Sequence, residues 1–348
     1  MKKVREEHEQ REHQFLSPHA AFADRSRGRA RPEEPCPVRT AFQHDRDRIL
    51  HCKSFRRLKH KTQVFLSPEG DHYRTRLTHC LEVSQIARTI ARALTLNEDL
   101  TEAIALGHDL GHTPFGHTGE KVIDRLFSGG FHHTVQSLRV VDQIEKDGAG
   151  LNLTAEVRDG ILKHSKGRGR VVSRAEEGGP ITLEGQVVRL SDLIAYVNHD
   201  LDDAVRAKVL SEADVPAPVV AALGRTHTER IHRMIVDTIE NSEVAEGGAI
   251  KLGDRAHQAA LDLREFLYER VYENDVVHKE LNRAERILEE LYAHFMRNEE
   301  VFYREYGQKA SPGDTHERAV VDYLAGMTDR YAVSVFKDLF IPQPWAVL

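Results

Sequence analysis

Apolar residues recur at helical spacing through most of this chain, and this pattern restricts its fold more than any other feature. In residues 76–94, apolar side chains from Val83 to Leu94 share one stripe of an amphipathic helix with His79. Strand signals are short, the best being residues 64–66 and 181–183. The sequence therefore predicts an all-α fold. The other predicted helices are 98–110, 131–144, 155–164, 185–207, 226–240, 255–272, 279–305 and 315–332.

The composition is that of a soluble globular protein. The 348 residues are 40% hydrophobic and 30% charged, which is enough for one large or two modest domains with a buried core. A net charge of −6 does not imply nonspecific binding to nucleic acid. No apolar run approaches the roughly 20 residues needed to cross a bilayer, so we expect no membrane partner.

Three cysteines, Cys36, Cys52 and Cys80, lack the CxxC spacing of metal sites. A sparse, odd set of cysteines is typical of a reducing compartment. The first residues are charged throughout and lack the apolar core of a signal peptide. These features predict a cytoplasmic protein.

The chain divides into three parts by composition. Residues 1–37 are rich in Arg, Glu, His and Pro, and we interpret them as a charged arm, mobile or docked on a partner, with folded structure starting near Val38. Residues 38–207 form the predicted core, and residues 208–348 a helical C-terminal region packed on it. Residues 165–185 are polar and rich in glycine, which predicts an exposed loop.

Four residues have the chemistry of a metal site. His79 and His108 lie on buried stripes of consecutive predicted helices, and Asp109 follows His108 at a helix end. Asp192 lies on an apolar helical face, where an unpaired carboxylate is costly to bury and a metal ion removes that cost. Two imidazoles and two carboxylates make an N2O2 set for a divalent ion. For each histidine taken singly, the alternative is a core residue that is only hydrogen-bonded.

Such a site need not be closed. An octahedral ion with four protein ligands keeps two positions for water and a phosphate oxygen. The histidines favour Mn, Fe, Co, Ni or Zn, although activity with added Mg stays compatible.

A glycine-rich loop after these ligands carries acid/base groups. In GHTPFGHTGE, residues 111–120, His117 and Glu120 are three residues apart, so Glu120 can orient the imidazole and raise its pKa if the segment is helical. This dyad suits general acid/base work on a metal-bound phosphate. A glycine turn with surface histidines is the alternative.

Further residues can shape a pocket around the metal. Arg76 precedes His79 by one helical turn and can reach anionic oxygens from the same face. Tyr196 and Asp200 follow Asp192 at i+4 and i+8, so they can line one wall. His132 and His133 begin another helix and can add a phosphate contact. Each of these residues can equally be structural.

These residues resemble the HD-domain phosphohydrolases, whose metal site is a His…His-Asp…Asp set. The similarity is greatest to the deoxyguanosinetriphosphate triphosphohydrolase-like branch, and it runs from about Arg39 to Ala207. One departure is Thr134, where the family often has Asn after the His. The similar segments are RDRILHCKSFRRLKHKTQVF, GDHYRTRLTHCLEVSQIARTIARAL, GHDLGHTPFGHTGE, LNLTAEV and LEGQVVRLSDLIAYVNHDLDDA.

The resemblance implies a role for each of the matching residues, within an HD-domain helical bundle with additional C-terminal helices. It implies metal ligands at His79, His108, Asp109 and Asp192. It implies catalytic or near-catalytic roles for His117 and Glu120, with His112 and His133 near the phosphates. It implies that Gln63 contacts the sugar, and that Arg76, Tyr196 and Asp200 contact triphosphate or sugar.

Family chemistry implies hydrolysis of a dNTP at the α-phosphorus to a deoxynucleoside and inorganic triphosphate, with dGTP the default substrate by family name. No Walker-type GxxxxGK[ST] sequence occurs, which disfavours a P-loop NTPase. Two alternatives stay open: an HD phosphohydrolase acting on another nucleotide or phosphate ester, and a nucleotide-sensing or single-stranded nucleic-acid-binding oligomer with weak turnover. The resemblance also implies a homo-oligomer, commonly a hexamer, and activation by a dNTP.

Overall fold

A computed structural model describes residues 4–63, 74–165, 178–246, 248–272, 275–306 and 313–342. Within these ranges the chain is helical and forms no β-strand beyond two isolated bridges. The predicted all-α fold is confirmed, and the stretch 181–183 leads into a helix instead of a strand. No helix in the described ranges is long and apolar enough to cross a membrane. Residues 64–66 and most of the predicted loop 165–185 lie outside the described residues.

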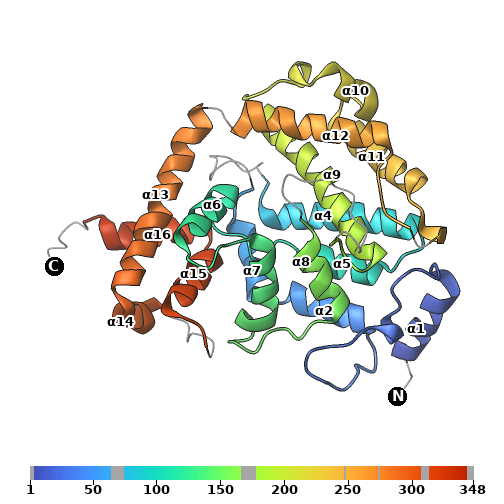
Figure 1. Cartoon of the computed structure of the whole chain (residues 1–348), viewed down its shortest axis with the longest axis horizontal. Helices are drawn as coiled ribbons and strands as arrows, with labels where there is room; N and C mark the ends of the chain where they lie inside the picture. Colours follow the sequence, from blue (N-terminus) through green and yellow to red (C-terminus); the bar gives the residue numbers. More distant parts are fainter. Residues whose placement is uncertain are drawn as a thin grey trace, which may run out of the picture.

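The helices follow one another in chain order (Figure 1). They are α1 (Val4–Phe15), α2 (Ala41–Leu50), α3 (Lys53–Arg57), α4 (Arg76–Ala93), α5 (Glu98–Gly107), α6 (Gly116–Leu126), α7 (His133–Arg139), α8 (Ala155–Lys163), α9 (Leu183–Arg206), α10 (Ala217–Leu223), α11 (His227–Asn241), α12 (Asp254–Leu267), α13 (Asp275–Arg297), α14 (Glu299–Val301), α15 (His316–Gly326) and α16 (Asp329–Phe340).

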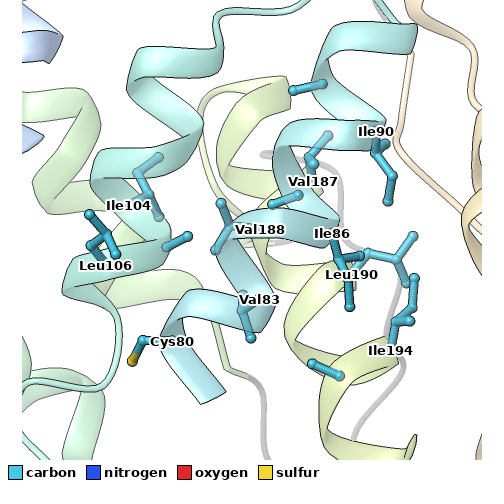
Figure 2. Close-up of a cluster of buried hydrophobic side chains, with 14 of the residues drawn as sticks. Cys80, Val83, Ile86, Ile90, Ile104, Leu106, Val187, Val188, Leu190 and Ile194 are labelled. Atoms are coloured by element: carbon cyan, nitrogen blue, oxygen red, sulfur yellow. The ribbon is translucent and has the colours of Figure 1, made fainter. Parts of the chain in front are cut away.

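A first hydrophobic core joins α4, α5 and α9 in the middle of the molecule (Figure 2). The stripe predicted for 76–94 is buried as expected, with Val83, Ile86 and Ile90 at most 1% exposed. Asn97, whose residue type favours helix N-caps, caps α5, because its side chain accepts hydrogen bonds from the backbone N–H groups of Asp99 and Leu100. This core fixes the three helices that carry the histidine and aspartate cluster.

A second hydrophobic core lies between α6 and the C-terminal helices α13, α15 and α16 (Figure 1). The prediction of one helix over 315–332 is wrong, because α15 ends at Gly326 and α16 begins at Asp329. Thr328 stops the first helix and starts the second: its side chain accepts a hydrogen bond from the N–H of Tyr331, which an N-cap does and a helix interior does not. The break lets both helices turn apolar faces to α13.

The N-terminal arm folds onto the first core, so the expectation that folded structure starts near Val38 is wrong. Its α1 is followed by a segment whose polar groups are bonded to core helices. The carboxylate of Glu184, buried at the start of α9, accepts from the N–H of Ala21, and Asn97 donates to the carbonyl of Ala21. Arg29 forms an ion pair with the buried Asp45. These hydrogen bonds and charges dock a segment whose apolar content is too low to form its own core.

Candidate metal centre and acid/base residues

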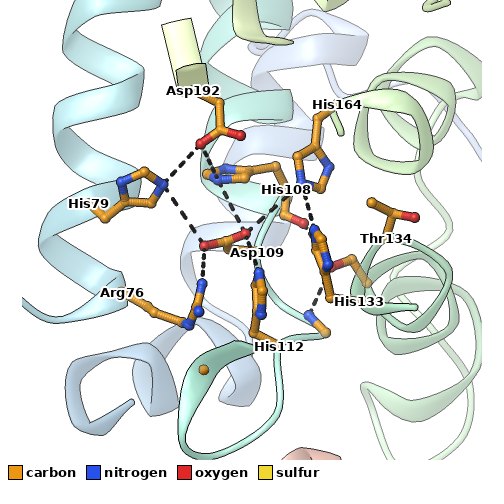
Figure 3. A network of polar contacts seen from close by, with 12 residues as sticks. Arg76, His79, His108, Asp109, His112, His133, Thr134, His164 and Asp192 are labelled. Atoms are coloured by element: carbon orange, nitrogen blue, oxygen red, sulfur yellow. Dashed lines mark hydrogen bonds and ion pairs between the residues drawn. The ribbon is translucent and has the colours of Figure 1, made fainter. Parts of the chain in front are cut away.

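Four side chains that are far apart in the sequence converge between α4, α5 and α9 (Figure 3). His79 comes from the first turn of α4, His108 caps α5, Asp109 follows it, and Asp192 points in from α9. His79 Nε2 lies 3.1 Å from Asp192 Oδ1, and His108 Nε2 lies 3.4 Å from Asp109 Oδ1 and 3.8 Å from Asp192 Oδ1. The four predicted ligands therefore share one small volume.

The orientation of His108 fits a metal ligand. Its Nδ1 lies 2.7 Å from the carbonyl oxygen of Ala105, so Nδ1 carries the proton and donates it. The lone pair then lies on Nε2, which is fully buried and has no hydrogen-bond partner among the described residues. A backbone carbonyl that fixes the tautomer in this way is the usual support of a metal-bound imidazole.

The carboxylates of the cluster are held ionised. Although burial raises the pKa of Asp109, the neighbouring His108, His112 and Arg76 hold it well below its ordinary value. Burial likewise raises the pKa of Asp192, but the hydrogen bond with His79 and the nearby His108 outweigh burial and lower it. Two ionised carboxylates beside two imidazole rings are the donor set of a divalent ion. The side chain of Asp192 is 24% exposed, so solvent reaches the cluster from this side.

Arg76 forms an ion pair with a residue of the cluster. Its Nη1 donates to Asp109 Oδ2 over 2.8 Å, and the side chain is only 4% exposed. His112 Nε2 lies 3.2 Å from the other oxygen of this carboxylate, Asp109 Oδ1. Burial and the charge of Arg76 lower the pKa of His112 well below its usual value, which keeps this imidazole neutral. Arg76 and His112 thus orient Asp109 from two sides.

The helix ahead of the cluster ends earlier than predicted. We expected it to run through Leu110, but α5 ends at Gly107. The hydroxyl of Ser137 on α7 donates to the carbonyl of His108 and accepts from the N–H of Gly111. It replaces hydrogen bonds that a longer helix would make within itself. The chain can therefore turn at His108 and present two adjacent side chains to the same volume.

The acid/base loop forms the rim of the site. Phe115 precedes α6 in a left-handed conformation, with φ of 63°, and α6 then carries His117 and Glu120. Glu120 Oε2 lies 3.7 Å from His117 Nδ1, while Oε1 accepts two shorter bonds of 2.8 Å from the N–H and Nδ1 of His133. Burial raises the pKa of Glu120, but the hydrogen bonds from His117 and His133 outweigh it and lower the pKa. Glu120 is thus an ionised carboxylate between two histidines.

His117 differs from the other site histidines in its exposure. Its side chain is 51% exposed, whereas those of His112 and His133 are at most 8% exposed. Its ring centroid lies 5.8 Å from that of His112 and 6.4 Å from that of Tyr196. His117 can therefore meet a bound molecule without displacing the buried cluster.

Gln63 contacts a candidate ligand. Its Nε2 lies 3.4 Å from His79 Nδ1, and its Oε1 is buried without a hydrogen-bond partner among the described residues. Rotating the amide by 180° would place the oxygen against Nδ1, where it can accept a hydrogen bond from Nδ1–H. In that orientation Gln63 supports His79 as the Ala105 carbonyl supports His108.

Tyr196 and Asp200 lie on α9 one and two helical turns after Asp192. Tyr196 is half-buried beside His117, and Asp200 is fully buried. His199 of the same helix was not predicted as a site residue, yet its Nδ1 lies 3.3 Å from His79 Nδ1. Its place on the apolar face of α9 was visible in the sequence, but a buried histidine alone does not point to a metal.

His164 is the main site residue that sequence reasoning missed. It follows α8 and is fully buried, with Nε2 3.2 Å from His133 Nε2 and 4.0 Å from Asp109 Oδ1. Burial and the neighbouring rings of His108 and His133 lower its pKa to about 3. Its only signal in the sequence is a histidine at the end of a predicted helix, which many surface helices share.

Gly111 is expected to be intolerant of any side chain. A Cβ at this position would lie 2.1 Å from the backbone nitrogen of Ser137 and 2.6 Å from the carbonyl oxygen of His133. Because these are backbone atoms, α7 would have to move away. We expect Gly111→Ala to lower the free energy of unfolding by about 1–3 kcal/mol, measured by urea denaturation. Gly326→Ala is the control, since its Cβ would meet only the flexible end of Arg57. Equal stability of the two variants would contradict this packing.

Known proteins are similar to this chain in sequence over nearly their whole length. A family model described as HD domain matches residues 76–197, and one described as Phosphohydrolase-associated domain matches residues 250–338. A relative from Caldanaerobacter subterraneus, named deoxyguanosinetriphosphate triphosphohydrolase-like protein, is 55% identical over 99% of this chain and 97% of its own. A relative of the same name from Desulfatibacillum aliphaticivorans is 54% identical over 98% and 99%. A solved hypothetical protein from Aquifex aeolicus is 20% identical, with a TM-score of 0.46, over 86% of this chain and 68% of its own.

Proposed function

Because this chain belongs to the family of deoxyguanosinetriphosphate triphosphohydrolase-like proteins with an HD domain, we propose that it is a metal-dependent dNTP triphosphohydrolase. It would cleave a dNTP at the α-phosphorus into a deoxynucleoside and inorganic triphosphate. The observation that carries the proposal is a buried N2O2 cluster with an exposed histidine and an ionised glutamate at its open side.

Four residues would hold the metal: His79, His108, Asp109 and Asp192. Their donor atoms fit it, since His108 Nε2 is an orphaned, buried lone pair and both carboxylates are ionised. A bound divalent ion would polarise the α-phosphoryl group and lower the pKa of a coordinated water.

The residues around the cluster would bind and orient the substrate. His112 and His133 stack with ring centroids 4.0 Å apart beside Asp109 and would face the phosphates. Arg76, held by Asp109, would add positive charge near the triphosphate. Gln63, Tyr196 and Asp200 would line the sugar and phosphate side of the pocket.

His117 would move the proton. Its exposure lets it meet the departing 5′ oxygen, and Glu120 Oε2, 3.7 Å from its Nδ1, would orient the ring. Water would attack the α-phosphorus, and the bond between phosphorus and the 5′ oxygen would break. The oxygen of that water would stay on the released triphosphate, while the 5′ oxygen takes a proton from His117 and leaves as the deoxynucleoside hydroxyl. The same dyad has no evident use in a protein that only binds nucleotides.

A panel of the four dNTPs, alone and in mixtures, tests the proposal. Each is incubated with the protein and Mn²⁺, Co²⁺ or Mg²⁺, and products are separated by chromatography. We expect deoxynucleoside and inorganic triphosphate in equal amounts from at least one nucleotide. Mixtures are needed because one dNTP would act as an activator of another in this family.

Other products would contradict the assignment in distinct ways. Release of a monophosphate or of orthophosphate would point to another phosphate ester as the substrate. Nucleotide binding with no product under any metal would point to a sensor. The oligomeric assembly that we also propose, a homo-oligomer up to a hexamer, is measured by light scattering in the presence and absence of nucleotide.

A further inference from the structure

A buried lysine and a buried aspartate join the acid/base loop to the C-terminal helices. The Nζ of Lys61 donates to the carbonyl oxygen of His112 and, over 2.7 Å, to that of Ala325 at the end of α15. Asp329, the first residue of α16, accepts from the N–H of Phe115 through Oδ1 over 3.0 Å. Lys61 is 2% exposed and Asp329 is 3% exposed. The loop from His112 to Phe115 is therefore held at both ends by side chains that lie outside it.

The backbone conformation of Phe115 needs such support. Its φ is 63° and that of Gly116 is 59°, so two consecutive residues lie in the left-handed region just before His117. A residue with a side chain rarely adopts this region, and it persists where the surrounding structure enforces it. The ring of Phe115 belongs to the second hydrophobic core, and its N–H is bonded to Asp329. The contacts that enforce the turn before His117 thus come largely from the C-terminal region.

The same aspartate bonds the segment that carries Gln63. Asp329 Oδ2 accepts from the N–H of Thr62 over 3.0 Å and from the Thr62 hydroxyl over 2.6 Å. This segment lies directly against the acid/base loop, since a Cβ added to Gly116 would be 2.9 Å from the carbonyl oxygen of Gln63. One buried side chain therefore fixes the spacing between the proposed sugar contact and the loop that leads to His117.

A lysine in this position is costly to bury. Burial lowers the pKa of Lys61 to about 7, although the charge of Asp329 opposes this shift. Replacing buried ions by apolar residues of similar volume is often neutral for stability. The two hydrogen bonds of Lys61 are therefore better explained by the single position of the loop that they select than by the stability that they add.

We propose that Asp329 and Lys61 are positioning residues for His117, so that the C-terminal region controls turnover from outside the metal cluster. This inference rests on the proposed role of His117 in the hydrolysis. Among the described residues, no hydrogen bond or ion pair joins Asp329 or Lys61 to the four proposed metal ligands. Loss of either contact would therefore shift the His117 imidazole and leave the metal in place, and a misplacement of about 1 Å can lower a rate by roughly 10²-fold.

Turnover of Asp329→Ala, measured well below the melting temperature of the variant, tests the proposal. We expect kcat to fall by about 10–100-fold, with the metal content unchanged by elemental analysis. In the His117→Ala background the same substitution is expected to cost no further turnover, because a positioning residue acts only through the group that it places. Lys61→Met keeps the length of the side chain and removes its donors. It is expected to lower kcat in the same way, and it tests the proposal if Asp329→Ala does not fold.

Glu317 of α15 provides a matched control. Its carboxylate accepts from the N–H of Ser128 over 3.0 Å and from the Ser128 hydroxyl over 2.6 Å, the same pair of bonds that Asp329 accepts from Thr62. It also accepts from the hydroxyl of Tyr292 over 2.7 Å. These bonds tie the C-terminal helices to the chain just after α6, away from the acid/base loop. Glu317→Ala is expected to lower the thermal stability as Asp329→Ala does and to keep the native kcat.

Amide hydrogen exchange adds a measurement that does not depend on turnover. Peptides covering residues 111–118 are expected to exchange faster in Asp329→Ala than in the native chain or in Glu317→Ala, because the N–H of Phe115 has lost its acceptor. Unchanged exchange of this loop would overturn the proposal. Native turnover in both Asp329→Ala and Lys61→Met, an equal loss in Glu317→Ala, or an additive loss with His117→Ala would overturn it as well. If no dNTP is hydrolysed, the proposed function fails, and the exchange result still decides whether Asp329 holds the loop.

Discussion

Replacing His117 by alanine is expected to lower turnover by about 10²–10⁴-fold, the usual contribution of a general acid or base. The metal content and the affinity for nucleotide are expected to stay unchanged, because His117 is 51% exposed and touches none of the four proposed metal ligands within 4.0 Å. The measurement is kcat and KM with the preferred dNTP, together with calorimetric nucleotide binding and elemental analysis.

The effect should fall on kcat and not on KM, since a proton donor acts in the transition state. His232→Ala, an exposed histidine away from the site, serves as the matched control and should keep native turnover. A kcat of His117→Ala within a few-fold of the native value would remove His117 from the acid/base role. A parallel loss of metal would show instead that the substitution disturbs the cluster.

Replacing Asp192 by alanine is expected to abolish binding of the metal ion, lowering the metal content by about one ion per chain. Asp192 Oδ1 is the oxygen that lies within 3.8 Å of both His79 Nε2 and His108 Nε2, so its removal leaves these two donors without their shared partner. Turnover is then expected to fall by roughly 10³-fold or more, because a catalytic ion contributes several kcal/mol to the transition state.

A carboxylate on the same helix provides the control. Asp202 of α9 pairs with Arg74 and Arg206 outside the cluster, and an ion pair of this kind contributes little. Asp202→Ala is expected to keep the native metal content and turnover. Full metal content in Asp192→Ala, measured by elemental analysis after dialysis, would refute its assignment as a ligand.

The helical period fixed more of the fold than any other sequence signal. The stripe below His79 and the cap at Asn97 were both visible, because a helix face and an N-cap depend on residues within a few positions of each other. The break at Thr328 was missed although its cap is local, since Thr328 accepts a hydrogen bond from the N–H of Tyr331. The early end of α5 at Gly107 was not visible, because it depends on the hydroxyl of Ser137, a group far along the chain that no local pattern reveals.

The N-terminal arm, residues 1–37, shows the same difference between what local sequence and what distant contacts determine. Its composition predicted that residues 1–37 form no core of their own, which agrees with how few apolar residues it contributes. Its docking depends on buried carboxylates of the core helices. Glu184 accepts a hydrogen bond from Ala21, well over a hundred residues away in the sequence, and Asp45 pairs with Arg29. A low apolar content therefore excludes an independent core but does not exclude a fixed position.

By itself, the sequence determined the helical class, the family resemblance and the four residues with ligand chemistry, since these follow from residue type and short spacing. The tertiary structure decided which further groups meet them. It turned Glu120 toward His133 more closely than toward His117, placed Gln63 against His79, and brought His164 within 3.2 Å of His133. The reason is physical: a lone pair becomes informative only when burial removes its water partners, and burial is set by the packing of helices distant in sequence.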